Sequence, residues 1–171
     1  MSSPGGQRRG RRQGGQPSLS KYLFDTNVCI YFFREFPPVV RFMEELFQQN
    51  EQHEKLLSVI TEAELLSVSS VATNHELKLL LQEFINDSDQ VVEVNREIAN
   101  LSGEIRSKLA YHYEKKVKLP DVLIAATALH TDAILVSNND KDFQTISTAY
   151  NLKYINPIQD QDELKHFLAT Q

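Results

Sequence analysis

Short apolar runs alternate along this chain with longer stretches of helical periodicity, and this alternation limits the available folds more than any other feature. The strand-like runs lie at 22–24, 55–61, 91–94, 133–137 and 152–155. Helical spacing of apolar residues is clearest over 37–49, 74–87, 96–116, 119–130 and 161–169, with a shorter helix predicted over 62–70. Strands that are joined through helices form parallel sheets covered on both faces. The sequence therefore predicts an α/β protein, a three-layer α/β/α sandwich around a mostly parallel sheet of about five strands.

The 171 residues suit one domain, which we predict to span residues 20–171. Residues 1–19 are rich in Gly, Gln, Ser and Arg and hold almost nothing to bury, so we expect a disordered extension there. Its four arginines are its only charges, and without them the net charge of −5 becomes −5 − 4 = −9. An extension that contacts RNA phosphates and an inert extension both fit this composition.

Several classes of protein are excluded by what the sequence lacks. Cys29 is the single cysteine, which rules out a disulfide framework and a thiolate metal site within the chain, and we expect it in the core. The five histidines are scattered, without the spacing of metal ligands. No apolar run approaches the roughly 20 residues that cross a bilayer, so we expect a cytoplasmic protein without membrane contact.

Acidic residues follow the ends of the predicted strands. Asp25 ends the first strand, Glu64 begins the helix after the second, and Asp121 begins the helix that Pro120 opens. Asp140 and Asp142 both follow the fourth strand, in "VSNNDKDF". Because the carboxyl ends of parallel strands meet at one edge of a sheet, we expect these carboxylates to converge.

Each acid also has an ordinary explanation, because acids complement the dipole of a first helical turn and Asp is common in turns. The joint pattern favours a shared site. Two unit charges about 4 Å apart repel by roughly 4 kcal/mol at an effective dielectric constant of 20, so a bound cation or a proton must relieve them. An oxygen-rich site without Cys or a His cluster is the preference of Mg²⁺ or Mn²⁺.

Four segments in this order resemble the PIN domain family, and most closely its VapC-type toxins of toxin–antitoxin modules. The segments are "LFDTNV", "SVITEAELL", "LPDVLIAATAL" and "ILVSNNDKDF". The resemblance runs from Tyr22 to about Pro157. Its third and fourth segments are specific in combination, whereas "DTN" alone is weak. The resemblance implies a metal-dependent endoribonuclease whose products carry 5′-phosphate and 3′-hydroxyl ends.

Position by position, the resemblance implies that Asp25, Glu64, Asp121 and Asp142 bind the metal and are catalytic, with one or two Mg²⁺ or Mn²⁺ ions. Glu62 is the alternative to Glu64, and Asp140 is the alternative to Asp142. The resemblance also implies supporting residues around the carboxylates, namely Thr26, Asn27, Ser137, Asn139 and Asp140. Asn139 stands where other members carry Asp, and Ser137 where Thr is commoner.

The resemblance further implies an RNA substrate, a cognate antitoxin of the VapB type that enters the cleft, and a homodimer. The apolar residues of "CIYFFREFPPVV" exceed the needs of one short helix, so they predict either a binding or dimer face or simple burial. Four cations are candidates for holding RNA, with ordinary solvated charge as the alternative: Arg34, Lys115, Lys116 and Lys141.

Two other enzyme classes fit poorly. A phosphoaspartyl transferase of the haloacid dehalogenase type needs Asp two residues after Asp25, where this chain has Asn27. A receiver domain needs an acid pair before the end of the first strand, and there is none. The alternative that stays open is a PIN scaffold that serves as a binding or regulatory module with little or no RNA cleavage.

Overall fold

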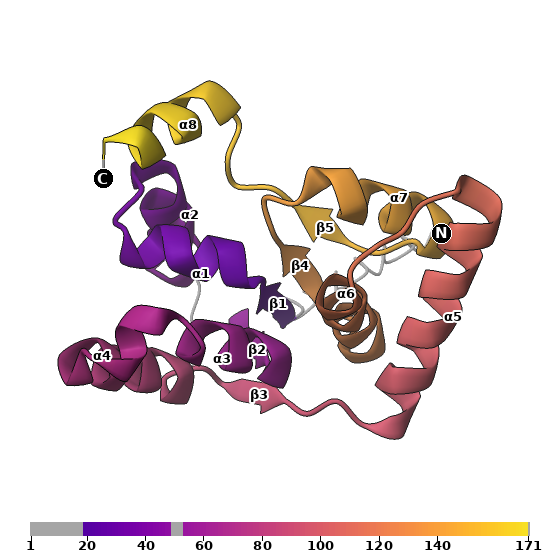
Figure 1. Ribbon diagram of the computed structural model, residues 1–171, viewed down its shortest axis with the longest axis horizontal. Helices are drawn as coiled ribbons and strands as arrows, with labels where there is room; N and C mark the ends of the chain where they lie inside the picture. Colours follow the sequence, from indigo (N-terminus) through magenta and orange to yellow (C-terminus); the bar gives the residue numbers. More distant parts are fainter. Residues whose placement is uncertain (1–18, 49–52, 171) are drawn as a thin grey trace, which may run out of the picture.

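The computed structural model describes residues 19–48 and 53–170 of the chain. Five parallel strands form one sheet in the order β3-β2-β1-β4-β5 (Figure 1). The strands are β1 (Ser20–Phe24), β2 (His53–Ser58), β3 (Gln90–Val92), β4 (Ile134–Val136) and β5 (Tyr154–Ile155). The helices are α1 (Thr26–Phe33), α2 (Pro37–Gln48), α3 (Val59–Leu66), α4 (His75–Asn86), α5 (Arg96–Tyr113), α6 (Leu119–Thr131), α7 (Asp140–Tyr150) and α8 (Gln161–Ala169), with a 3₁₀ helix η1 (Ser69–Ala72). The predicted α/β class is confirmed.

Two hydrophobic cores lie on opposite faces of the sheet, which makes the three predicted layers. Helices α5, α6 and α7 cover one face, and α1, α2, α4 and α8 cover the other (Figure 1). Successive residues of the central strands enter opposite cores, since strand side chains alternate. Leu23, Leu56 and Leu135 pack on the first face, and Phe24, Leu57 and Val136 pack on the second.

Helix α6 is deeply buried between the sheet and α5. Its residues Val122, Ile124, Ala125, Ala126, Thr127 and Ala128 are all buried. Pro120 lies in its first turn, where a missing N–H costs nothing. The run of small residues permits close packing between the sheet and α5, so the start of α6 is held firmly beside the ends of the strands.

The second strand and its helix differ from the prediction. The strand ends at Ser58 and α3 begins at Val59, whereas the sequence predicted a strand to 61 and a helix from 62. The reason is a cap that the apolar run hides: the Ser58 side chain accepts a hydrogen bond from the N–H of Ile60 at 3.2 Å. Glu64 therefore lies in the second turn of α3, and the prediction that it begins the helix is wrong.

Two further differences from the prediction concern the existence of α7 and the buried face of α4. Helix α7 was not predicted, because Phe143 and Ile146 are the only buried residues in its eleven positions. In α4, Leu81 and Ile85 are buried as the spacing predicts, but Leu80 is 50% exposed.

The predicted extension over residues 1–19 lies outside the described residues except for Leu19, which is exposed. Cys29 is buried in the core beside the sheet, where burial raises the pKa of its thiol. Among the described helices, none is long and apolar enough to cross a membrane.

Candidate functional site

The site lies at the carboxyl ends of β1 and β4, where the chain order of the strands reverses. The backbone N–H of Asp25 donates to the carbonyl of Val136 at 3.0 Å, which joins the two strand ends. Open α/β sheets bind ligands at such a switch point because the following loops part to opposite sides. Asp25 and Ser137, from distant parts of the sequence, are therefore neighbours.

Asp25 is a buried carboxylate that is held only by neutral hydrogen-bond donors. It is 3% exposed, and it caps the N-terminus of α1, with its Oδ1 accepting from the N–H of Thr26 at 2.8 Å. Its Oδ2 accepts from Asn27 Nδ2 at 2.8 Å and from Ser137 Oγ at 2.6 Å. Burial raises the pKa of Asp25 to about 6, against the opposing effect of the bonds from Ser137 and Thr26. The charges of Asp121 and Glu64 raise this pKa further.

Glu64 joins this group through α3. The Thr26 hydroxyl donates to Glu64 Oε2, so the residue after Asp25 links the two acids. The charge of Glu64 raises the pKa of both Asp25 and Asp121. Glu62, the alternative from the sequence, lies in the first turn of α3 and contributes to neither of these pKa shifts. The structure therefore brings Glu64, and not Glu62, close to Asp25 and Asp121.

Asp121 and Asp142 form the other half of the site. Asp121 lies in the first turn of α6 and Asp142 in the first turn of α7. Asn139 Nδ2 donates to Asp142 Oδ2 at 3.2 Å and approaches Asp121 Oδ1 at 3.5 Å, so one amide spans both carboxylates. Burial and the charges of Asp142 and Glu64 raise the pKa of Asp121, while nearby Lys118 and Asn139 lower it.

Lys115 also contacts this half of the site, which the sequence did not predict. Its Nζ lies 3.5 Å from Asp142 Oδ1, donates to Thr145 Oγ1 at 2.9 Å and contacts the carbonyl oxygen of Lys141. From the sequence, Lys115 was predicted only as one of four cations that could hold RNA. No spacing rule links it to Asp142, because the contact depends on how the α5–α6 connection folds over α7.

Asp140 faces away from the other acids and holds the turn after β4. Its carboxylate accepts from the Tyr154 hydroxyl and from Asn156 Nδ2, the latter at 3.0 Å. Burial, and then Asp140, raise the pKa of Tyr154 well above its usual value, so the phenol stays protonated and can donate. Of the two acids that the sequence left open, Asp142 lies in the site and Asp140 is bound elsewhere.

The chemistry of the donor set fits a hard divalent cation. Four carboxylates with no Cys or His among them supply the oxygen ligands that Mg²⁺ and Mn²⁺ prefer. Burial, and then the charges of neighbouring acids, raise the pKa of Asp25 and of Asp121, and the donors that hold Asp25 are all neutral. In the described residues no three acids, His or Cys close on one point tightly enough to enclose an ion as they stand. An ion would therefore need side-chain movement, and Asp121 and Asp142 are only partly buried.

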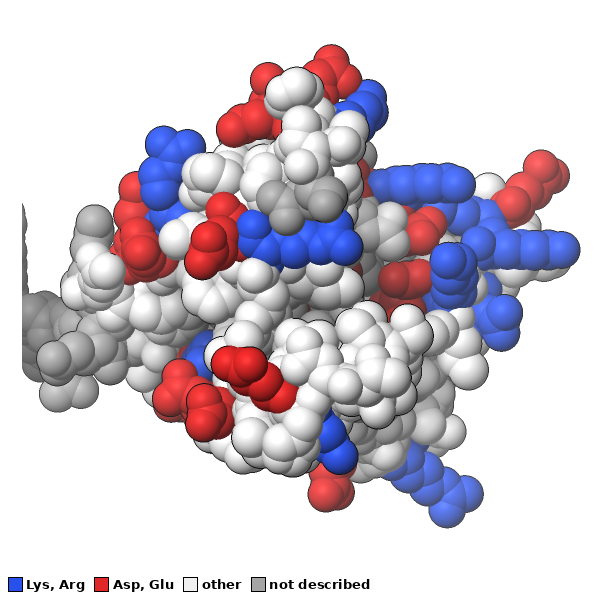
Figure 2. All heavy atoms as spheres, turned by 60° about the vertical axis from the view of Figure 1, so that its left-hand side comes forward, with Lys and Arg blue, Asp and Glu red and all other residues white. Residues whose placement is uncertain are grey.

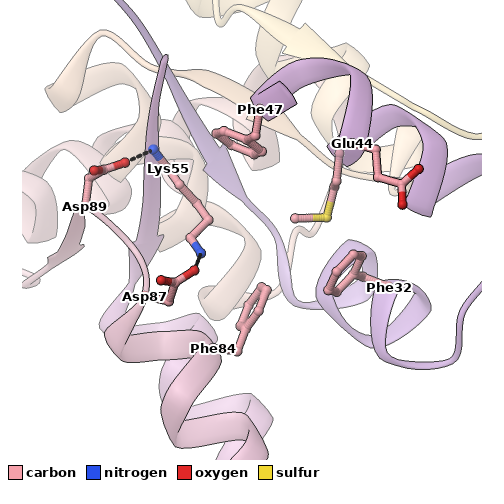
Figure 3. A pocket seen from close by; sticks show the side chains of 8 residues that line it. Phe32, Glu44, Phe47, Lys55, Phe84, Asp87 and Asp89 are labelled. Carbon is pink, nitrogen blue, oxygen red and sulfur yellow. Dashed lines mark hydrogen bonds and ion pairs between the residues drawn. The ribbon is translucent and has the colours of Figure 1, made fainter. Parts of the chain in front are cut away.

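A pocket lies on the opposite side of the sheet from α6. This pocket of about 370 Å³ is bounded by α1, α2, β2 and α4, and Phe32, Phe47 and Phe84 face it (Figure 3). The Lys55 ammonium lies 3.0 Å from Asp87 Oδ2 and 5.0 Å from the centre of the Phe84 ring. Three acids line the pocket, namely Glu44, Asp87 and Asp89.

Comparison with known proteins agrees with the resemblance that the sequence indicated. The PIN domain family model matches residues 22–148. Ribonuclease VapC1 of Haemophilus influenzae (strain R2866) is 29% identical over 130 residues, 74% of this chain and 92% of that protein. The tRNA(fMet)-specific endonuclease VapC of Shigella flexneri is 29% identical over 128 residues, 75% of this chain and 93% of that protein. The structure of VapBC-1 from nontypeable Haemophilus influenzae matches with a TM-score of 0.67 and 26% identity, over 80% of this chain and 98% of that chain.

The buried Asp25 carboxyl predicts a pH dependence of stability in the metal-free protein. Its pKa rises from 3.8 to about 6 on folding, so between these values the folded protein holds a proton that the unfolded chain has lost. The free energy of unfolding then falls by about 2 kcal/mol as pH rises from 4 to 6 and by about 3 kcal/mol over the whole titration. Above about pH 7 both states are ionised, and the contribution stays constant.

The measurement is urea unfolding in EDTA between pH 4 and pH 8, for the wild type and for Asp25→Asn. We expect the difference between the two free energies of unfolding to change over pH 4–6, because the other titrating groups cancel. Parallel pH profiles for the two proteins would contradict the raised pKa.

Proposed function

The chain belongs to the PIN domain family, and we propose that it is a VapC-type endoribonuclease, the toxin of a toxin–antitoxin pair, which cuts RNA with the help of Mg²⁺ or Mn²⁺. The observation that carries the proposal is the gathering of Asp25, Glu64 and Asp121 from three distant segments. Thr26 links Asp25 to Glu64 through hydrogen bonds, and the charge of Glu64 contributes to the raised pKa of both Asp25 and Asp121. Carboxylates gathered in this way repel one another and lower the stability of the fold unless a cation neutralises their charge. Nucleases of this family depend on a divalent metal ion, and this chain has the donors for one.

Asp25, Glu64, Asp121 and Asp142 would hold the ion. When bound, a divalent ion supplies a water of lowered pKa as nucleophile and stabilises negative charge on the phosphate. Whether the site takes Mg²⁺ or Mn²⁺ is decided by affinity under working conditions, because both prefer oxygen ligands.

The surrounding side chains fix the carboxylates before substrate arrives. Ser137 and Asn27 hold Asp25 Oδ2, and the hydroxyl of Thr26 orients Glu64. Asn139 spans Asp121 and Asp142 with a neutral amide, which avoids the extra repulsion that a fifth carboxylate would add. Because these side chains are already oriented, little reorganisation is needed when the phosphodiester binds.

The first test is RNA cleavage by the purified full chain. We expect Mg²⁺ or Mn²⁺ to support cutting, EDTA to stop it, and Asp25→Asn to reduce the rate at least a hundredfold, because the buried carboxylate would lose its charge. Cut ends are read by gel electrophoresis and end-sequencing. Addition of Mn²⁺ to a Ca²⁺-free buffer should also raise the thermal midpoint of unfolding of the wild type but not that of Asp25→Asn.

Two results would reject the proposal. Cleavage that survives both EDTA and Asp25→Asn would exclude a carboxylate-bound metal. Absence of cleavage together with absence of any divalent-ion stabilisation would favour the scaffold, the binding module without nuclease activity.

Matched pairs of substitutions test which acids take part. Glu64→Gln and Asp142→Asn should each slow cleavage about tenfold or more, because each removes a charge from the site. Glu62→Gln should leave the rate within twofold. Asp140→Asn should chiefly lower thermal stability, because it disturbs the bonds from Tyr154 and Asn156. Cleavage rates and melting midpoints are measured on all four; loss of activity in Glu62→Gln with Glu64→Gln active would overturn the assignment.

For the antitoxin, we propose the pocket between α1, α2 and α4 as a docking surface. Its phenylalanines and rim acids fit a partner segment that is apolar and carries basic side chains (Figure 3). The solved structures similar to this chain include VapBC complexes, which supports a partner of this kind. The homodimer stays a prediction.

Charge reversal on the rim tests this surface. Glu44→Lys should weaken binding of the cognate antitoxin about tenfold, whereas Glu45→Lys, an exposed neighbour outside the pocket lining, should change it less than threefold. Isothermal titration calorimetry with the purified antitoxin measures both affinities. Equal effects of the two substitutions would exclude the pocket as the docking surface.

A further inference from the structure

Residues 111–118 comprise the last residues of α5 and its connection to the start of α6. We propose that this tyrosine–lysine segment binds unpaired RNA beside the acidic site. Tyr111 would stack on a base, and Lys116 and Lys118 would contact backbone phosphates. The inference rests on the proposed function, since it takes RNA as the substrate. It adds a surface outside the carboxylates and a preference for nucleotides that are not base-paired.

The segment runs directly to the site. In Figure 1 the connection leaves the outer end of α5, passes α7 and reaches the start of α6. Its Lys115 contacts Asp142, and its Lys118 lies close enough to Asp121 to lower the pKa of that acid. An RNA strand that lies along the segment would therefore bring a phosphate to the acids.

The charge of the segment is opposite to that of the chain. Three lysines and Glu114 give residues 111–118 a net charge of +3 − 1 = +2, in a chain of net charge −5. Figure 2 shows Lys and Arg side chains gathered beside a recess that contains acidic side chains. Among the described residues, neither Lys116 nor Lys118 has a carboxylate within ion-pair distance, whereas Lys115 is paired with Asp142. Two cations thus remain for phosphate.

Tyr111 supplies an aromatic face that the fold does not use. Its side chain is 83% exposed, and its ring meets His112 edge-on, at 83° between the planes and 4.9 Å between the centres. Tyr113, two residues on, is 51% exposed. Exposed aromatic rings beside lysines are what proteins use to stack and hold unpaired bases.

A cavity lies between α5 and this segment. It has a volume of about 420 Å³ and is lined by Gly103, Arg106, Ser107, Ala110, Lys116 and Leu119. Arg106 Nε donates to the carbonyl of Val117 at 3.1 Å, which ties the segment to α5. Space beside Gly103 is open, since no atom would lie within 4 Å of a Cβ there. The cavity offers room and donors for a ribose or phosphate beside Lys116.

Unpaired RNA fits these features better than two other occupants. Duplex RNA hides the faces of its bases within the helix stack, so Tyr111 would have nothing to stack on. A symmetric contact in which the segment faces the same segment of a second copy is disfavoured, because two segments of charge +2 repel.

The experiment uses the full chain with Asp25→Asn, so that RNA is bound without being cut. Fluorescence anisotropy measures the Kd for a labelled unpaired 12-nucleotide RNA and for a blunt duplex of the same sequence. Adding Tyr111→Ala should raise the Kd for unpaired RNA about tenfold, in the range expected for losing one stacked base. Tyr111→Phe keeps the ring and should stay within twofold, and the duplex Kd should change less than twofold.

Salt dependence tests the lysines separately. Lys116→Ala with Lys118→Ala should reduce the slope of log Kd against log salt by about 1.4, because each phosphate contact to a single strand contributes about 0.7. The matched control replaces Lys78 of α4 and Lys165 of α8, both exposed, by Ala and should leave the slope unchanged. An equal loss of slope in the control would overturn the proposal.

The outcomes separate this surface from the proposed function. Cleavage that depends on Asp25, with unpaired-RNA binding that ignores Tyr111, Lys116 and Lys118, overturns the surface and leaves the nuclease intact. Tyr111-dependent binding of unpaired RNA in a wild-type chain that cuts nothing supports the surface and rejects the nuclease. A change of oligomeric state on Tyr111→Ala in sedimentation velocity, without a change in RNA affinity, would assign Tyr111 to a contact between copies and overturn the proposal.

Discussion

The buried carboxylate of Asp25 is the constraint on which the rest of the site depends. Three neutral donors hold it. Burial raises its pKa to about 6, and the charges of Asp121 and Glu64 contribute to this rise. Near pH 7 it is ionised at a cost to folding. Lys115, the lysine that reaches the acids, contacts Asp142 rather than Asp25. A bound divalent cation would relieve this cost, which is why we regard the charge at Asp25 as a reason for metal binding.

The fold makes that arrangement possible. Two separate cores fix β1 and β4 side by side, and the reversal of strand order between them opens the edge where Asp25 and Ser137 meet. The buried small residues of α6 hold Asp121 at the same edge. Because these supports come from core packing, the backbone that carries the acids is fixed, and ion binding would need only movement of their side chains. The tyrosine–lysine segment then adds positive charge at the rim of a site that would otherwise repel RNA.

Much of this could be predicted from the sequence, because strand ends and helix starts are local patterns. The parallel sheet, the helix from 161 to 169 and the neighbourhood of Asp25, Glu64 and Asp121 all follow from periodicity and from the rule that parallel strand ends converge. Glu64 was placed one turn too early, because an apolar run over "SVIT" reads as strand while a single Ser58 hydrogen bond begins the helix. The choice between Asp140 and Asp142 needed tertiary contacts, since both follow the same strand. The contact from Lys115 to Asp142 could not be predicted from the sequence either, because it depends on the path of the connection between α5 and α6.

The central claim is that these distant acids share one divalent cation, and crystals soaked in MnCl₂ test it most directly. The account predicts an anomalous-difference peak among Asp25, Glu64, Asp121 and Asp142, and its loss in crystals of Asp25→Asn. Well-ordered acids with no peak between them, or a peak that persists unchanged without the Asp25 carboxylate, would contradict the account.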